Sequence, residues 1–247
     1  MTQNLRTAVL LTILLVIMSG LYVSNRLTSP EQETDTPRIV ENSFNGTIPS
    51  EIVRGDTSKN QVIFTFDAGS GNASVEKILA ALEKHQVKGT FFMTGIWALR
   101  NPEAARMIAA KGHEIFNHTY NHPKLTELID ATITQELINT DSALELILAT
   151  STKPYFRPPY GDRDARVLAT AAKAGYRSVY WTIDAGDWME SEGMSADEVA
   201  YRILTNIEPG NIFLMHVGDT LTGEILDRVF SAIEQRGYKI VALTQGL

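Results

Sequence analysis

Short apolar runs alternate with amphipathic stretches from residue 61 onward, which predicts a repeating order of strands and helices. The runs are rich in β-branched and aromatic residues, as is typical of buried strands; they cover residues 61–66, 89–93, 113–116, 155–156, 178–183, 211–215 and 238–243. Helical spacing and capping signals between them predict helices at 75–82, 102–110, 131–149, 164–174, from Ser195 onward and at 224–235. Strands that alternate with helices form parallel βα units, so the pattern predicts an α/β fold.

The N-terminus follows a different pattern. Residues 7–25 carry no charge and are flanked by Arg6 and Arg26. About 20 apolar residues are enough to cross a bilayer, so we expect residues 1–26 to form a membrane anchor. Small residues near its end leave a cleaved signal peptide as the alternative. Either reading places the bulk of the chain outside the cytoplasm.

A polar, acidic stretch at residues 27–60 has little to bury and is predicted to be a linker. The folded domain is expected at residues 61–247. With 247 residues in all, 44% of them hydrophobic, the chain can form one domain with a substantial core. The net charge of −7 argues against nucleic-acid binding, which needs a basic face. The absence of cysteine excludes disulfides and thiolate metal sites.

Polar residues of the types that catalyse reactions or bind metal ions follow five of the predicted strands. They are Asp67, the pair His118 and His122, Arg157, the pair Asp184 and Asp187, and His216. In a βα-barrel the loops at the C-terminal ends of the strands meet at one mouth. We therefore expect these side chains to share one site, because chance would rarely place such residues after five strands.

His118 and His122 are four residues apart, and one helical turn would point both rings the same way. Two imidazoles on one face form half of a divalent-metal site. Two solvated loop histidines would have the same spacing, so the pair gains weight from the other four loops.

These motifs in their order resemble the polysaccharide deacetylase family, also called the NodB-homology domain or carbohydrate esterase family 4. The resemblance covers residues 61–243, and its motifs lie at residues 65–67, 118–122, 157–161, 184–188 and 214–216. It implies a distorted (β/α)7 barrel and hydrolysis of acetyl groups, mainly N-acetyl, on a hexosamine polymer. The family's range includes peptidoglycan, chitin-like polymers and O-acetylated xylan.

The resemblance also implies roles for individual residues. Asp67 would be the general base and His216 the general acid. His118 and His122 would bind a divalent metal ion, with Zn favoured and Co or Ni possible. Positioning and substrate contacts would come from Arg157, Pro158, Tyr160, Asp184, Asp187 and Trp188: Arg157 holding Asp67, Asp187 orienting His216, the Tyr160 backbone N–H facing the oxyanion and Trp188 lining the acetyl pocket.

One position departs from the family pattern. The first motif normally has two adjacent aspartates, and the second is Ala68 here. A methyl group cannot bind a metal ion, so we expect a weakened metal site. The alternative is a glycan-binding module without activity; a scaffold for a partner protein has no support in the sequence. Trp181 is expected to be a core aromatic residue, and Asp184 is either a site residue or a turn-former.

Overall fold

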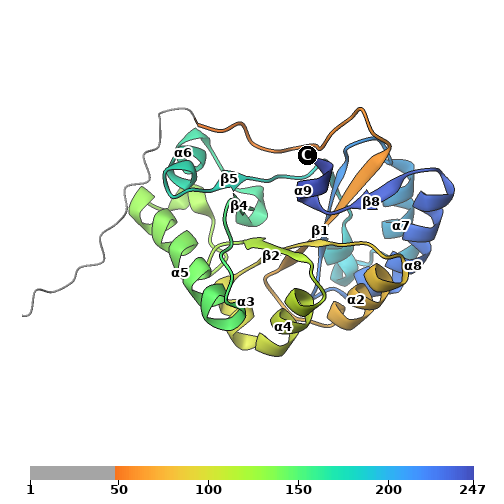
Figure 1. Ribbon diagram of the computed structural model, residues 1–247, viewed down its shortest axis with the longest axis horizontal. Helices are drawn as coiled ribbons and strands as arrows, with labels where there is room; N and C mark the ends of the chain where they lie inside the picture. The colour runs from red at the N-terminus through yellow and green to blue at the C-terminus, as the bar shows by residue number, and fades with distance from the viewer. Residues whose placement is uncertain (1–47) are drawn as a thin grey trace, which may run out of the picture. The chain divides into compact units, whose positions relative to one another are not determined.

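The computed structural model describes residues 48–247 (Figure 1). All strand pairs are parallel, in the order β5-β4-β3-β2-β1-β7-β6, and β8 pairs with the start of β1. The strands are β1 Gln61–Ala68, β2 Thr90–Met93, β3 Glu114–Asn117, β4 Tyr155–Phe156, β5 Arg177–Ser178, β6 Ile183–Asp184, β7 Ile212–His216 and β8 Lys239–Val241. The α/β prediction is confirmed: the strands form a curled parallel sheet with helices on its outer face (Figure 1).

The helices agree closely with the pattern in the sequence. They are α2 Val75–Lys84, α3 Gly95–Arg100, α4 Pro102–Ala110, α5 Asp130–Leu148, α6 Ala165–Lys173, α7 Ala196–Thr205, α8 Thr220–Gln235 and α9 Leu243–Gly246. The capping box of Ser195 and Glu198 is present at the start of α7. Short α3, capped by the Thr94 side chain, was not predicted because six residues show little periodicity.

The central strand β1 explains how one face of the sheet becomes a core and the other a site. Successive side chains of a strand point to opposite faces. Phe64, Phe66 and Ala68 are buried in the main apolar cluster together with residues of α2 and α8. Thr65 and Asp67 point the other way and contact Arg157. The site therefore lies on the inner face of the curled sheet, opposite the helices.

The prediction of a continuous strand at residues 178–183 was wrong. The segment forms β5 and β6, separated by residues 179–182. The rings of Tyr180 and Trp181 stack with centroids 3.8 Å apart and an interplanar angle of 14°. Neighbours on a regular strand point to opposite faces, so this stacking requires the strand to break between β5 and β6.

Residues 50–58, which the sequence assigned to the linker, pack against the domain. Ile52 is 3% exposed and forms a parallel bridge with Val179. Further on, the backbone N–H of Gly55 donates to Gly210 O and that of Asp56 to Gly246 O. Figure 1 shows this segment in orange, running from the β5 side toward β8. The domain therefore begins before Gln61, because this segment supplies backbone partners beside the broken strand.

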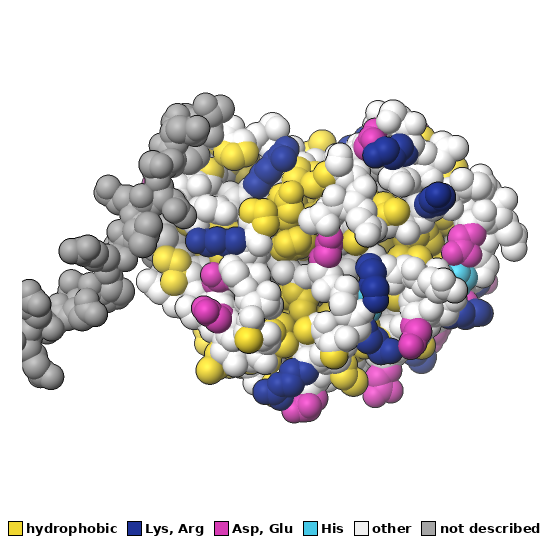
Figure 2. All heavy atoms as spheres, viewed as in Figure 1, with side chains coloured by type: hydrophobic (Ala, Val, Ile, Leu, Met, Phe, Trp, Pro, Cys, Tyr) yellow, Lys and Arg dark blue, Asp and Glu magenta, His cyan; other side chains and the backbone are white. Residues whose placement is uncertain are grey.

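The predicted anchor at residues 1–26 and most of the predicted linker lie outside the described residues. Among residues 48–247, no helix is both long and apolar enough to span a membrane. On the face shown in Figure 2, basic and acidic side chains are interspersed with apolar ones.

Candidate active site

The loops that follow the strands meet at a cleft of about 630 Å³. Its lining residues are Asp67, Gly69, Ser70, His118, His122, Tyr160, Trp181, Asp184, Trp188, Leu214, His216 and Asp219. Arg157 and Asp187 are fully buried and contact Asp67 and His216. The structure thus brings together residues from all five predicted loops, which are separated by up to 149 positions in the chain.

Asp67 is held as a carboxylate at the floor of the cleft. It is 5% exposed, and Arg157 Nη1 donates to its Oδ1 at 2.7 Å. Burial alone would raise the pKa of Asp67, but the charge of Arg157, followed by those of His118 and His216, holds it below its usual value. The group is therefore ionised at neutral pH and able to accept a proton.

Arg157 connects Asp67 to the broken strand. Its guanidinium is fully buried and donates to Thr65 Oγ1 at 2.9 Å, to Val179 O at 3.3 Å and to Tyr180 O at 3.1 Å. A buried charge is stable when it is paired and hydrogen-bonded, as this one is. Removal of its carboxylate partner would leave an uncompensated charge, which typically costs about 3–5 kcal/mol.

His118 presents one ring nitrogen to the cleft in a defined state. Its Nδ1 lies 2.9 Å from the carbonyl oxygen of Arg157. A carbonyl can only accept, so Nδ1 carries the proton, and Nε2 of the neutral ring carries a lone pair. Burial lowers the pKa of His118 and favours this neutral ring. Nε2 lies 3.3 Å from Asp67 Oδ2, so two lone-pair atoms face each other.

His122 reaches the same place although residues 118–122 form a loop and not the helical turn that their spacing would allow. Thr119 and His122 both have positive φ, at 64° and 61°. The loop is held by Glu136, whose carboxylate accepts the backbone N–H groups of Tyr120 and Asn121 at 2.8 Å. The rings of His118 and His122 nevertheless approach to 4.8 Å between centroids. Burial and the charge of His118 lower the pKa of His122 to about 4.

The residues present fit a divalent cation held by His118 and His122. Both rings are neutral, as metal ligation requires. A histidine ligand commonly donates its other ring N–H to a backbone carbonyl, as His118 does. The facing lone pairs of His118 Nε2 and Asp67 Oδ2 repel unless a positive charge lies beside them. Ala68 contributes no ligand: its methyl group is fully buried in the apolar core.

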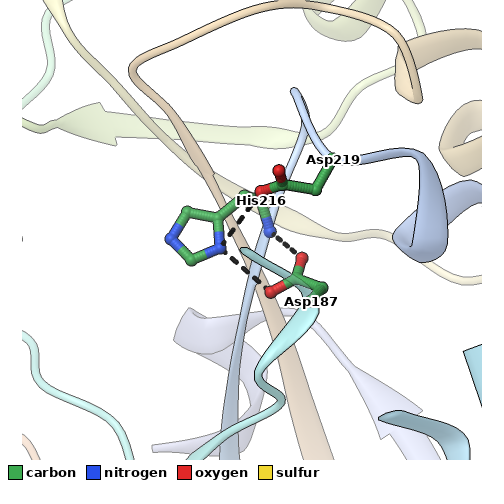
Figure 3. Close-up of side chains that lie close together, drawn as sticks. All are labelled: Asp187, His216 and Asp219. Carbon is green, nitrogen blue, oxygen red and sulfur yellow. Dashed lines mark hydrogen bonds and ion pairs between the residues drawn. The ribbon is translucent and has the colours of Figure 1, made fainter. Parts of the chain in front are cut away.

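A second cluster surrounds His216 (Figure 3). His216 Nδ1 lies 3.0 Å from Asp187 Oδ1 and 3.9 Å from Asp219 Oδ2, and its backbone N–H donates to Asp187 Oδ2 at 2.6 Å. The Thr222 hydroxyl also donates to Asp187. The other ring nitrogen, Nε2, points away from both carboxylates (Figure 3).

This cluster has the spacing of a metal site, because one ligand atom from each of the three residues lies within 4.8 Å of the others. Its electrostatics favour a proton instead. Burial alone would lower the pKa of His216, but the hydrogen bond and charge of Asp187, with the charges of Asp67 and Asp219, raise it to about 9. A protonated imidazole has no lone pair for a metal ion. We therefore assign His216 to holding a proton.

The remaining predicted residues lie on the cleft wall or behind it. Tyr160 is 66% exposed and has φ 57°, whereas Pro158 is buried. Asp184 accepts the Gly186 backbone N–H at 2.9 Å and the Trp188 indole N–H at 3.2 Å. Asp184 is thus both a turn-former and a cleft residue, since it fixes the ring of Trp188 on the wall.

Five lining residues were not among the predicted site residues: Gly69, Ser70, Trp181, Leu214 and Asp219. Trp181 was expected in the core, yet it is only partly buried and lines the cleft. Its exposure depends on the strand break, which a short apolar run does not reveal. Asp219, three residues after His216, could have been suspected from its place behind a strand end. Burial and the charge of Asp187 raise its pKa.

Comparison with known proteins places this geometry in context. A polysaccharide deacetylase family model matches residues 54–179. A peptidoglycan-N-acetylglucosamine deacetylase of Bacillus cereus is 34% identical over 76% of this chain and 69% of its own length. An uncharacterised Bacillus subtilis protein is 36% identical over 80% of this chain, which spans 60% of that protein's length.

Solved structures include an informative relative. A pseudoenzyme of the CE4 family from Bacillus anthracis superposes with a TM-score of 0.76 and 32% identity, covering 82% of this chain and 70% of that one. A mutant of the same pseudoenzyme, described as having restored enzymatic activity, superposes with the same TM-score at 33% identity, covering 82% and 72% of the two chains.

Proposed function

We propose, from the premise that the chain belongs to the polysaccharide deacetylase family, that it removes N-acetyl groups from a hexosamine-containing polysaccharide. The CE4 relatives and the curled parallel sheet support assignment of the fold as the distorted (β/α)7 barrel of this family. Peptidoglycan and chitin-like polymers are the substrate classes that the relatives' names support, and O-acetyl groups are a further class within the proposal.

The observation that carries the proposal is a carboxylate and an imidazole on neighbouring strands, each paired with a buried group of opposite charge, Arg157 for Asp67 and Asp187 for His216. Asp67 at the end of β1 and His216 at the end of β7 are register partners. Their environments lower the pKa of Asp67 and raise that of His216. Paired groups whose pKa values are pushed apart are the usual basis of an acid–base assignment. Asp67 is thus the proposed base and His216 the proposed acid.

Hydrolysis of an amide needs both functions. Asp67 accepts a proton from the attacking water, whose oxygen adds to the acetyl carbon. His216 donates the Nε2 proton to the amide nitrogen as the C–N bond breaks, which yields acetate and the free amine. Asp187 accepts the hydrogen bond of the His216 Nδ1–H and so fixes the ring. Arg157 keeps Asp67 ionised, and the Tyr160 backbone N–H is the proposed donor to the oxyanion.

A divalent cation at His118 and His122, with zinc favoured and cobalt or nickel as alternatives, would polarise the acetyl carbonyl and acidify water. Two imidazoles are a smaller ligand set than a site with an added carboxylate. We therefore propose reversible binding that is lost on dialysis against a chelator.

The second candidate is a glycan-binding module with little or no activity. Ala68 favours it, because the chain lacks the carboxylate that the family pattern has at this position. The similarity to a CE4 pseudoenzyme points the same way. The intact Asp67–Arg157 and His216–Asp187 pairs favour the hydrolase, since a binding module has no need for a poised acid and base.

Acetate release decides between these candidates. The domain is incubated with peptidoglycan, N-acetylglucosamine oligomers and acetylated xylan, after chelation and again with Zn²⁺, Co²⁺ or Ni²⁺ added. The hydrolase proposal expects metal-dependent acetate release that Asp67→Asn reduces about 10²-fold or more. Glycan binding without acetate release under any of these conditions would establish the binding module instead.

We also propose that the domain works outside the cytoplasm, held by residues 1–26. This proposal depends on the uncharged segment at residues 7–25 and on the extracytoplasmic nature of envelope glycans. The glycan and, through the N-terminal segment, the membrane are the proposed partners.

A further inference from the structure

The stacked pair Tyr180 and Trp181 forms an aromatic step at the break between β5 and β6. Their rings are parallel to within 14° and 3.8 Å apart. Trp181 lines the cleft and is partly exposed, whereas Trp97, the largest fully buried side chain of the domain, is 2% exposed in the core. The step therefore presents indole surface to the cleft, which a purely structural tryptophan need not do.

Cationic side chains fix this step from two sides. Arg157 donates to the carbonyl oxygens of Val179 and Tyr180, and these hydrogen bonds hold the irregular backbone. Arg163 lies over the other ring, with its guanidinium carbon 3.6 Å from the Tyr180 centroid. Glu51 binds Arg163 through two hydrogen bonds of 2.9 Å. The side chains thus form a column that ends at the cleft, in the order Glu51, Arg163, Tyr180 and Trp181.

Gly161 closes the remaining side. A Cβ on Gly161 would lie 2.6 Å from Tyr180 Cε2 and 2.8 Å from Trp181 Cη2, so a larger residue would displace both rings. The same short turn carries Tyr160, which projects into the cleft. Gly161 thus lets this turn pack closely against both rings, which leaves the indole little freedom to move when a ligand binds.

Such preorganisation lowers the cost of binding, because little side-chain entropy is lost. The Arg157 guanidinium carbon lies 5.8 Å from the centroid of the indole, and the indole lines the cleft, where it offers apolar surface beside polar groups. The ring faces of pyranose sugars carry C–H groups and stack on such surfaces. An indole has no group that gains or loses a proton near neutral pH, so the surface of Trp181 can serve binding but not proton transfer.

We propose that Trp181 is a sugar-stacking platform that binds a unit of the polymer next to the one carrying the reacting acetyl group. The identity of the ligand as a hexosamine polymer rests on the proposed function; the platform itself rests on the column and the cleft. The platform adds affinity for oligomers that reach beyond one sugar, and it does so whether or not the acetyl group is hydrolysed.

The test measures binding, which is independent of catalysis. N-acetylglucosamine oligomers of one to six units are titrated calorimetrically into the chelated domain, residues 48–247. Wild type is expected to bind longer oligomers more tightly than the monosaccharide. Trp181→Ala should weaken the binding of the longer oligomers about tenfold, the usual scale for loss of an aromatic anchor. The affinity for the monosaccharide should be unchanged. Trp181→Phe should retain most of the gain.

Tyr201→Ala serves as the matched control, because Tyr201 is a 70% exposed aromatic residue on α7 and does not line the cleft. Thermal unfolding of each variant checks the fold. Length-dependent binding that Trp181→Ala leaves unchanged would overturn the platform and spare the proposed function. Binding of no oligomer by wild type would overturn both. Trp181-dependent binding without acetate release would support the platform and overturn the hydrolase.

Discussion

At the residue scale, the two carboxylate neighbours of His216, Asp187 and Asp219, support its proposed role as the acid. Its pKa is raised from 6.5 to about 9, so its protonated form is stabilised in the folded protein. The resulting stability is fully present below pH 6.5 and is lost as the pH rises through about 9. We expect the activity to fall over the same upper range, because the acid loses its proton.

The corresponding measurement is denaturant unfolding of wild type and His216→Gln at pH 6, 8 and 10. The stability difference should be of the order of 1–3 kcal/mol at pH 6 and shrink toward zero at pH 10. A difference that stays constant across this range would show that the ring does not change charge there. Asp219→Asn provides the companion variant, and it should lower the pH at which activity falls.

Ala68 is the residue that we expect to depart from the first motif of the family. Its backbone continues the β1 ladder by pairing with Met93, and its methyl group is buried in the apolar core. We expect Ala68→Asp to tighten Zn²⁺ binding, because a carboxylate would join the two imidazoles. It should also lower the melting temperature, since the new charge must leave the core by disturbing the end of the strand.

Ala68→Asn is the matched control, with nearly the same size and no charge. Calorimetric Zn²⁺ titrations of wild type and both variants should rank Ala68→Asp first, with Ala68→Asn close to wild type. Equal affinities for the two variants would mean that the carboxylate does not reach the metal. The sequence analysis singled out position 68 but could not show that its side chain faces the core.

At the element scale, most of the structure follows from local patterns. The helices at 102–110 and 131–149 were predicted to within one residue, because their apolar periodicity and proline or cap signals agree with their burial. The break in residues 178–183 was missed for a physical reason. It depends on Arg157, more than twenty positions earlier, donating to the carbonyls of Val179 and Tyr180. Such a long-range contact leaves no local signature.

We expect the segment at residues 48–60 to stabilise the domain. A chain that begins at Gln61 loses Ile52, whose full burial is worth about 1.5–3 kcal/mol, and the Glu51–Arg163 pair. Compared with residues 48–247, we expect its melting temperature to be lower by about 5–10 °C. Thermal unfolding by circular dichroism would measure the shift.

Val53→Ser is the matched control for this segment, because Val53 is 47% exposed and its carbonyl, not its side chain, accepts the Thr182 hydroxyl. It should unfold at nearly the wild-type temperature. Equal melting temperatures for the chains beginning at 48 and at 61 would show that the segment contributes nothing to stability. A lower value would confirm that the broken strand needs this neighbour.

At the scale of the whole molecule, the site is assembled by strand order, not by proximity in the chain. Asp67 and His216 are adjacent because β1 and β7 pair, and Arg157 reaches both β1 and the gap before β6. The sequence could predict this convergence because parallel strands present their C-terminal ends at one edge. It could not predict ring orientations, such as the Nδ1–H of His118, which depend on single carbonyl groups.

Residues 7–25 are predicted to attach the domain to a membrane. If residues 7–25 form an uncleaved anchor, the full chain expressed in a bacterial host should sediment with membranes, whereas residues 48–247 should not. External protease should digest the domain in cells whose outer layers are opened, because an anchor of this orientation would place the domain outside the cytoplasm. A cytoplasmic protein probed in the same cells is the control. Recovery of a freely soluble exported form that begins near Asn25 would refute the anchor and support a cleaved signal peptide, because the domain would then reach the envelope without remaining tethered.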